Sequence, residues 1–152
     1  MIDRIRTIMN ELLEHSRGVT VTTLTDDAIP ETRMIFNLLN PSDFPGLKDF
    51  FNEPDIKGRL LFGTNTSSEK IEQLKKNNRL TAYYTIPDQF KGMMIYGTVK
   101  LHDDPDLKQR MWLDGWTIYY PKGPSDPDYT IFELMPVYAK GWYEMRPFHE
   151  NF

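Results

Sequence analysis

The stretch RLLFGTNTSSEKIEQLKKNN, residues 59–78, leads from an apolar segment through a run of small polar side chains into a charged segment. Its apolar start, residues 59–64, predicts a β-strand. Residues 67–77 predict a short helix with Ile71 and Leu74 on its buried side. A strand that leads directly into a short helix indicates a fold that mixes both element types. The polar cluster between the two, residues 64–68, also raises a question of function.

Two interpretations of the polar cluster stay open on the pattern alone. In the first, Thr66 or Ser67 caps the helix, and Thr66 with Glu69 matches the capping-box pattern. One cap, however, accounts for only one hydroxyl group. In the second, the free N–H groups and the dipole of the helix N-terminus hold a phosphate. Ser67 or Ser68 would then donate from its hydroxyl group, and Lys70 would add a positive charge.

The rest of the chain predicts short strands joined mainly by turns. A first helix begins at Asp3 and ends before Gly18, because its apolar residues fall on one stripe. Alternating or apolar β-branched runs predict the strands. The other helices are expected over residues 47–51, 67–77 and 105–113, and the strands over residues 19–25, 32–40, 59–64, 79–86, 93–102, 129–135 and 137–145, with Pro136 between the last two.

This order of elements predicts an α+β fold built on a mostly antiparallel sheet, because neighbouring strands connect through hairpins. Seven short strands without an obvious uncovered edge favour a barrel with a few flanking helices. At 152 residues the chain fits a single domain, residues 1–152.

Composition narrows the classes of function. The absence of cysteine excludes disulfides and thiolate chemistry. Eighteen basic against 22 acidic residues give a net charge of −4, so we expect no nucleic-acid partner. The first fifteen residues lack an apolar core of signal-peptide length, and no segment is long enough to span a bilayer. We therefore expect a cytoplasmic protein without a membrane partner.

Common catalytic and metal-binding patterns are missing from the sequence. His15, His102 and His149 lie far apart, and none has the spacing of a metal site, so no metal is expected. The chain contains no G-x-S-x-G, no P-loop and no G-x-G-x-x-G. Serine hydrolases and the usual ATP, GTP and NAD sites are therefore not indicated.

Four segments resemble the pyridoxamine 5'-phosphate oxidase-like flavoproteins. The pattern T-N-x-x-S-x-K after an apolar strand resembles the flavin-phosphate segment of that family. Upstream, RMIFNLLN resembles its R-x-V/M-L-L strand. Downstream, MMIYGTVKLHDDPDL and MWLDGWTIYYPKGPSDPDYTIFELMPVYAKGWY resemble the later strands and the ending of its general stress protein branch. The resemblance runs from about Val19 to Trp142.

The resemblance implies a split β-barrel homodimer with FMN at the subunit interface. It implies that Arg33, Met34 and Ile35 border the flavin ring and the ribityl phosphate. Trp116, with Trp112 as a second candidate, would approach the ring from the partner chain, although both tryptophans could instead fill a dimer core. The flavin tail would be held by the polar cluster and its lysine: Thr64, Asn65, Thr66, Ser67, Ser68 and Lys70.

The sequence departs from the true oxidases at several positions. Leu38 replaces a second phosphate-binding lysine, Glu69 replaces an arginine, and Gly92 replaces a glutamine that faces the flavin. The substrate-binding R-x-H is absent, because Arg146 and His149 have a different spacing. These departures argue against vitamin B6 oxidation.

The resemblance therefore predicts an FMN-dependent oxidoreductase that acts on an unidentified small molecule, with a nicotinamide nucleotide as a candidate reductant. One alternative is a non-catalytic module that stores or senses flavin. Another is a barrel that binds a different planar cofactor such as haem, with an axial ligand from His15, His102 or His149.

Overall fold

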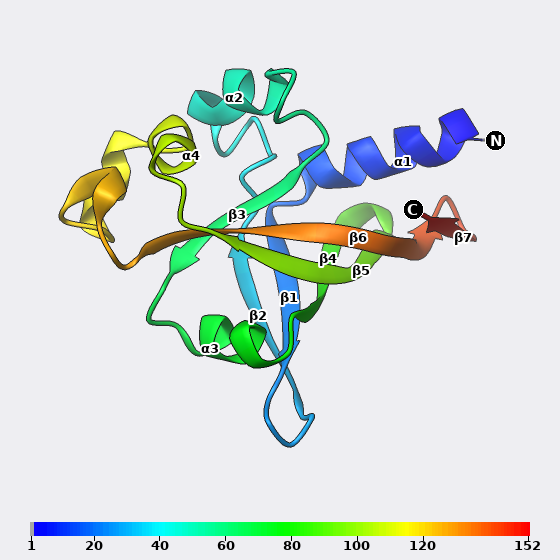
Figure 1. Cartoon of the computed structure of the whole chain (residues 1–152). Helices are drawn as coiled ribbons and strands as arrows, with labels where there is room; N and C mark the ends of the chain where they lie inside the picture. The colour runs from blue at the N-terminus through cyan, green and yellow to red at the C-terminus, as the bar shows by residue number, and fades with distance from the viewer. Residues whose placement is uncertain (1) are drawn as a thin grey trace.

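One curled antiparallel sheet forms the centre of the computed structural model, which describes residues 2–152 (Figure 1). Short helices and turns surround it, and none of the helices within this range is long and apolar enough to cross a membrane. The strands are β1 (Gly18–Leu24), β2 (Pro30–Phe36), β3 (Leu60–Asn65), β4 (Arg79–Ile86), β5 (Lys91–His102), β6 (Tyr129–Tyr143) and β7 (Arg146–Asn151). The helices are α1 (Ile2–His15), α2 (Lys48–Asn52), α3 (Glu69–Lys76) and α4 (Pro105–Arg110), with 3-10 turns η1 (Pro45–Leu47), η2 (Pro87–Gln89), η3 (Asp114–Ile118) and η4 (Gly123–Ser125).

The strands follow the order β2-β1-β4-β5-β6-β3, and β7 pairs with the C-terminal part of β6, from Tyr138 to Tyr143. Every pair is antiparallel. Within the described chain the end strands β2 and β3 do not pair with each other, so the sheet curls without closing. The predicted α+β split-barrel fold is confirmed.

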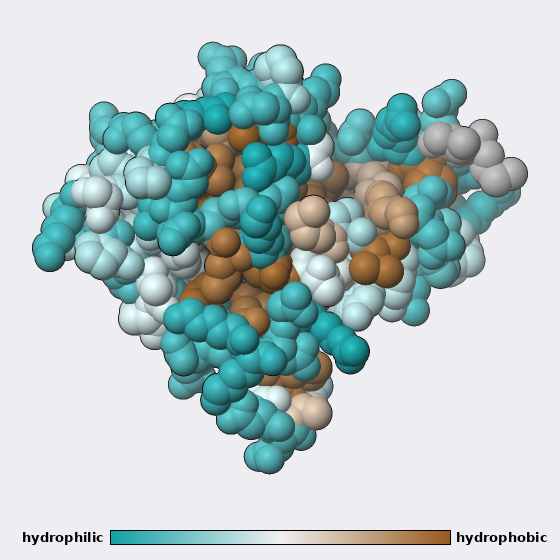
Figure 2. Space-filling view, viewed as in Figure 1, coloured by the Kyte–Doolittle hydropathy of each residue, from teal (hydrophilic) through white to brown (hydrophobic). Residues whose placement is uncertain are grey.

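The core forms because strand and helix periodicities place apolar side chains on the same inner face. Val19 and Val21 of β1 are fully buried, while Thr20 between them and Thr22 after them are half-buried on the other face. On α1, Ile8 and Leu12 pack onto the sheet. A second apolar cluster lies under α2, α4 and η3, and Leu38, Met111 and Tyr129 belong to it. Apolar surface remains visible in the middle of Figure 2, where β5 and β6 cross, and below α1.

The strand predicted over residues 32–40 is shorter than expected and ends at Phe36. The cause is Asn37, which is buried and whose side-chain amide donates to the carbonyl groups of Leu13 and Ser16, at 2.7 and 2.8 Å. Those bonds turn the chain toward the end of α1, so Leu38 leaves the strand.

The expected break at Pro136 does not occur, and β6 continues through it as one strand of 15 residues. The register between β5 and β6 shifts between Tyr96 and Gly97, so a bulge absorbs the proline. A Cβ on Gly97 would lie 2.0 Å from the carbonyl oxygen of Met135, so only glycine fits opposite the bulge. Strand β7 was not predicted, because its segment RPFHEN lacks a β-branched run.

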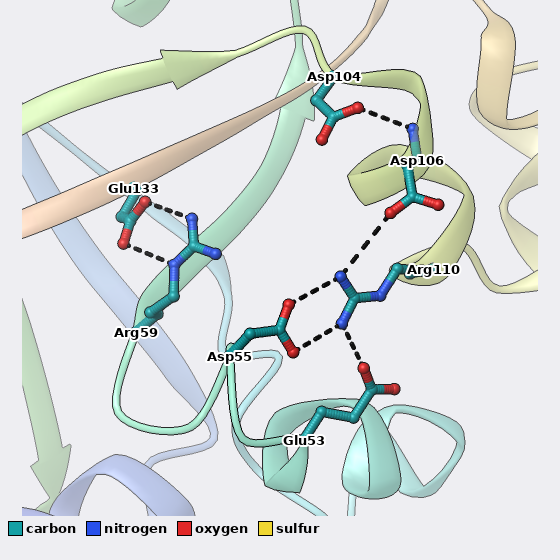
Figure 3. A network of polar contacts seen from close by, with 7 residues as sticks. All are labelled: Glu53, Asp55, Arg59, Asp104, Asp106, Arg110 and Glu133. Carbon is teal, nitrogen blue, oxygen red and sulfur yellow. Dashed lines mark hydrogen bonds and ion pairs between the residues drawn. The ribbon is translucent and has the colours of Figure 1, made fainter.

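A polar network joins α4 to the segment before β3 (Figure 3). Arg110 of α4 contacts the carboxylates of Glu53, Asp55 and Asp106. Beside it, Arg59 donates two hydrogen bonds, of 2.9 and 2.7 Å, to the buried carboxylate of Glu133. The contacts of Arg110 hold α4 against the segment before β3, and both lie beside the second apolar cluster.

Candidate functional site

A cavity of about 390 Å³ lies between β2, the end of β3, the start of α3 and the aromatic segment 116–129. Six of the residues predicted for the cofactor site line it: Met34, Ile35, Thr64, Asn65, Lys70 and Trp116. Eight further residues complete its wall: Arg17, Gly18, Phe36, Leu38, Gly63, Tyr119, Tyr120 and Tyr129. The sheet therefore brings together segments that lie about 100 residues apart.

The floor of the cavity is built from β2 and the start of β1. Met34 is 76% exposed and Phe36 is 52% exposed, which is unusual for large apolar side chains on a strand. A Cβ on Gly18 would come within 2.7 Å of the sulfur of Met34, so the side chain of Met34 lies over this glycine. The floor thus presents apolar side chains to whatever enters the cavity.

The polar end of the cavity lies where β3 passes into α3. The helix begins with Ser68 as its N-cap, and the Ser68 side chain makes no capping hydrogen bond. The interpretation in which Thr66 or Ser67 caps this helix is therefore wrong. The Ser68 hydroxyl instead accepts a 3.2 Å hydrogen bond from the Nζ of Lys70.

The segment Asp126–Asp128 clamps the polar cluster from outside. The carboxylate of Asp128 accepts hydrogen bonds from the side chain of Asn65, at 2.7 Å, and from the backbone N–H of Ser67, at 2.8 Å. The Thr66 hydroxyl donates to the Pro127 carbonyl, at 2.9 Å. The bonds from Asn65 and Ser67 lower the pKa of Asp128. This carboxylate is consequently ionised, and it holds the loop in one shape.

Lys70 lines the polar end of the cavity and Arg33 lies near it outside the lining, and among the described residues neither forms an ion pair with an acid. Burial and the neighbouring charge of Arg33 lower the pKa of Lys70. Arg33 donates to uncharged oxygens only: the Thr23 hydroxyl at 2.6 Å, the Glu31 carbonyl at 2.9 Å and the Gln73 amide at 3.4 Å. Within residues 2–152, neither Lys70 nor Arg33 has a carboxylate oxygen within 4.0 Å of its charged nitrogens. The polar end therefore carries uncompensated positive charge.

Another part of the cavity wall is aromatic. The rings of Tyr120 and Tyr129 lie 4.9 Å apart, and Trp116 meets Tyr129 edge-on at 6.1 Å. Burial, with the nearby charges of Asp128 and Asp126, raises the pKa of Tyr120 to about 12. Burial also raises the pKa of Tyr129, whose buried hydroxyl has no hydrogen-bond partner among the described residues. Both hydroxyl groups are protonated at neutral pH and can donate.

Five residues predicted for the site lie outside the cavity lining: Arg33, Thr66, Ser67, Ser68 and Trp112. Thr66 and Ser67 bind the Asp126–Asp128 segment, and Ser68 meets the cavity through Lys70. Trp112 packs behind the wall, edge-on to Trp116 at 6.0 Å. The resemblance implies that Trp116 approaches from the partner chain, whereas here it lines the cavity of its own chain.

Sequence reasoning missed the tyrosines of the aromatic wall, and it missed Arg17 and Gly18 at the beginning of β1. The motif W-T-I-Y-Y-P contained the signal for Tyr119 and Tyr120, but no pattern predicted which face they would take. None of the three histidines lines this cavity, and His102 is bonded to Glu133 at 2.7 Å. In the described part of the chain, no group of three or more metal-ligating side chains comes together.

Fold and cavity together define a split-barrel protein with a site that is lined by a cation, a polar cluster and aromatic side chains. The sequence profile described as pyridoxamine 5'-phosphate oxidase like matches residues 51–148. That match covers more than half of the chain, and the chain belongs to this family.

Solved structures agree with this assignment. A protein of Clostridium acetobutylicum, described as related to general stress protein 26 and as pyridoxinephosphate oxidase family, is 28% identical. It superposes with a TM-score of 0.76 over 98% of this chain and 95% of that one. General stress protein 26 of Bacillus anthracis shares the fold at 14% identity, with a TM-score of 0.72 over 98% and 99% of the two chains.

A third similar structure is the general stress FMN/FAD binding protein of Xanthomonas citri. It is 18% identical and has a TM-score of 0.66 over 99% of this chain and 96% of that one, which shows a shared fold. Among curated protein sequences, none matches the chain.

Proposed function

We propose that the chain binds FMN in the cavity and acts as a flavin-dependent oxidoreductase on a small molecule. The observation that carries this proposal is Lys70, which lacks a counter-ion and has Arg33 near it, in a cavity that is also lined by aromatic side chains. A ligand that carries both a doubly charged phosphate and a flat ring matches the cation and the aromatic side chains of this lining. The Xanthomonas citri protein, named for FMN/FAD binding, supports the same ligand class.

The residues present fit such a group. A phosphate beside Lys70 would supply the counter-charge that this half-buried lysine lacks, and the Ser68 hydroxyl would donate to it. The unpaired hydroxyl of Tyr129 would find an acceptor in a polar ligand. The cavity of about 390 Å³ falls within the range of roughly 300–1,000 Å³ usual for cofactor sites.

In this proposal the cofactor and the side chains of the cavity have separate roles. When bound, FMN supplies two-electron chemistry, while the protein supplies position and electrostatics. Ile35 and Trp116 would exclude water from the ring, and the raised pKa of Tyr120 keeps its hydroxyl group a hydrogen-bond donor. Leu38 lines the cavity where the true oxidases carry a second lysine, so a single lysine would hold the phosphate.

We also propose a homodimer whose interface includes the open side of the cavity. Met34, Thr20, Tyr83 and Met94 stand opposite one another across β2, β1, β4 and β5 and share the outer face of the sheet. Met34 is 76% exposed and Tyr83 is 44% exposed. Large exposed apolar patches are typical of protein interfaces, and a second copy would cover this face beside the cavity.

A non-catalytic flavin-storage module is the second candidate. The observation in its favour is that the cavity lining, within residues 2–152, contains no carboxylate or histidine that could act as a base at neutral pH. A site of this kind binds flavin without a dedicated proton acceptor for a substrate.

Absorbance of the purified protein tests the ligand. Flavin bands, with FMN recovered after denaturation, are expected, and a colourless protein that takes up no added FMN would contradict the proposal. Stopped-flow reduction by NADPH or NADH then separates enzyme from module, because a storage module leaves both nucleotides unused. Pyridoxamine phosphate is expected not to be oxidised in a single turnover.

A further inference from the structure

Gln73 of α3 lies between an acidic and a basic side chain of β2. Its amide NH₂ group donates a hydrogen bond to the carboxylate of Glu31, and its carbonyl oxygen accepts one from Nη2 of Arg33, at 3.4 Å. The same oxygen accepts a hydrogen bond from the hydroxyl group of Thr23, which is fully buried. Because a carbonyl oxygen accepts and an NH₂ group donates, these partners allow the amide of Gln73 only one orientation.

The carboxylate of Glu31 is bound to Gln73 and not to Arg33. Glu31 and Arg33 lie two residues apart on β2, so their side chains project from the same face of the strand. Among the described residues, however, Arg33 has no carboxylate oxygen within 4.0 Å of its charged nitrogens. Its Nη1 donates to the Thr23 hydroxyl, at 2.6 Å, and to the backbone carbonyl of Glu31, at 2.9 Å. Arg33 therefore keeps its full charge although an acid lies nearby.

That charge acts on the flavin cavity through Lys70. Burial and the charge of Arg33 lower the pKa of Lys70, which lines the cavity. Helix α3 carries both Lys70 and Gln73, and it lies beside the β1–β2 hairpin that carries Arg33 (Figure 1). An acid paired with Arg33 would offset its charge, so a phosphate next to Lys70 would be attracted less strongly.

We propose that Gln73 is a positioning residue for the FMN phosphate, because it binds the carboxylate of Glu31 and leaves the charge of Arg33 available to the ligand. A neutral amide can hold an acid and a cation apart, since it offers a donor to the first and an acceptor to the second. Gln73 itself does not line the cavity and acts through Arg33. This inference rests on the proposed function, since it concerns the same cavity.

Fluorescence titration of the flavin-free protein with FMN and with riboflavin tests this role. In Gln73→Ala the carboxylate of Glu31 is released and can pair with Arg33, so FMN affinity should fall by about threefold to fivefold, the size of a partly exposed ion pair. Riboflavin affinity should not change. The double variant Gln73→Ala/Glu31→Gln removes the released acid and should restore the FMN affinity of the wild type.

Lys76→Ala is the matched control for packing of the helix. Lys76 contacts Asp26 at 3.1 Å, so it also joins α3 to the β1–β2 hairpin, but it does not bond to Arg33. Its removal should leave the ratio of FMN affinity to riboflavin affinity unchanged. If Gln73 only held α3 in place, Gln73→Ala would behave like this control or would weaken both ligands alike.

The outcomes separate the role of Gln73 from the flavin site itself. Unchanged FMN affinity in Gln73→Ala would show that Glu31 does not neutralise Arg33. FMN binding that stayed weak in the double variant would make Gln73 a support of the helix. Both results would overturn the inference and leave the FMN site intact, whereas a wild-type protein that binds no FMN would contradict the proposed function and the role of Gln73 together.

Discussion

Arg110 and Lys70 are both partly buried cations, but only Arg110 has acidic partners within the described chain. Arg110 contacts three carboxylates, those of Glu53, Asp55 and Asp106 (Figure 3). Lys70 has one neutral contact, the Ser68 hydroxyl. The pKa of Arg110 is raised by its partners, whereas the pKa of Lys70 is lowered by burial and by Arg33.

The difference separates a structural cation from one that is available to a ligand. Charges that are neutralised inside the chain support the fold, and they offer no unpaired charge to a ligand. A cation that is desolvated without a counter-ion makes folding less favourable, and only an incoming anion offsets that cost. We therefore propose that a phosphate is stabilised most at the Lys70 end of the cavity.

The largest expected effect comes from removing the cation without a counter-ion. Lys70→Met should weaken FMN binding by about 1.5–3 kcal/mol, the usual size for a hydrogen bond to a charged group. That loss corresponds to roughly a tenfold to hundredfold change in Kd. Riboflavin binding should stay nearly constant, and thermal stability without ligand should stay constant or rise, because the uncompensated charge makes folding less favourable. Lys75→Met, on the exposed side of the same helix, is the control for titration and melting; a fall in melting temperature specific to Lys70→Met would mean that Lys70 supports the helix instead.

The next largest effect should come from the Asp128 clamp. Asp128→Ala removes the acceptor for Asn65 and for the Ser67 N–H, so the polar loop loses its fixed shape. We expect FMN binding to weaken by about 1–2 kcal/mol, with a smaller change for riboflavin. Asp114→Ala, an exposed acid in η3, is the control in the same fluorescence titration. Unchanged FMN affinity would show that the loop keeps its shape without the carboxylate.

Breaking the neutralised network should affect stability alone. Arg110→Met leaves three carboxylates together without their cation, and we expect a small loss of folding stability, because these partners are largely exposed. For a chain of this size a small loss of folding stability lowers Tm only slightly. Calorimetry measures the shift, and FMN affinity should be unaltered. If Arg110→Met also weakened FMN binding, Arg110 could not be called a purely structural cation in contrast to Lys70.

The smallest effect concerns pH. The protonated form of Lys70 binds phosphate, and its pKa lies below the ordinary 10.5. As the pH rises through this lowered pKa, the lysine loses its charge and FMN affinity falls, while riboflavin affinity does not change in the same way. Paired titrations of FMN and riboflavin between neutral pH and pH 10 measure the difference between them. A constant FMN-to-riboflavin ratio across this range would contradict the role of Lys70.

Much of the fold follows from local patterns. The alternation in β1 and the apolar stripe of α1 predict their buried faces, because period 2 and period 3.6 each select one face. The other features of the fold depend on long-range contacts, so local patterns could not predict them. The continuation of β6 through Pro136 depends on Gly97 of the neighbouring strand, and no local signal in the proline segment reveals that bulge.

The candidate site also has features that the local sequence predicts and features that only the fold reveals. The polar cluster with Lys70 was visible as a motif, since its residues are adjacent in the sequence. Its clamp was not, because Asp128 lies 63 residues from Asn65 and the two meet only through the pairing of β3 with β6. The aromatic wall likewise depends on where the 116–129 segment folds back over β2.

Parallel titration of the flavin-free protein with FMN and riboflavin is the most direct test of the central claim, that cations without a counter-ion mark a phosphate site. The two ligands share the ring and differ in the phosphate. We expect FMN to bind at least about tenfold more tightly at low salt. The margin should narrow as salt screens the phosphate. Equal affinities for FMN and riboflavin at low salt would contradict the account.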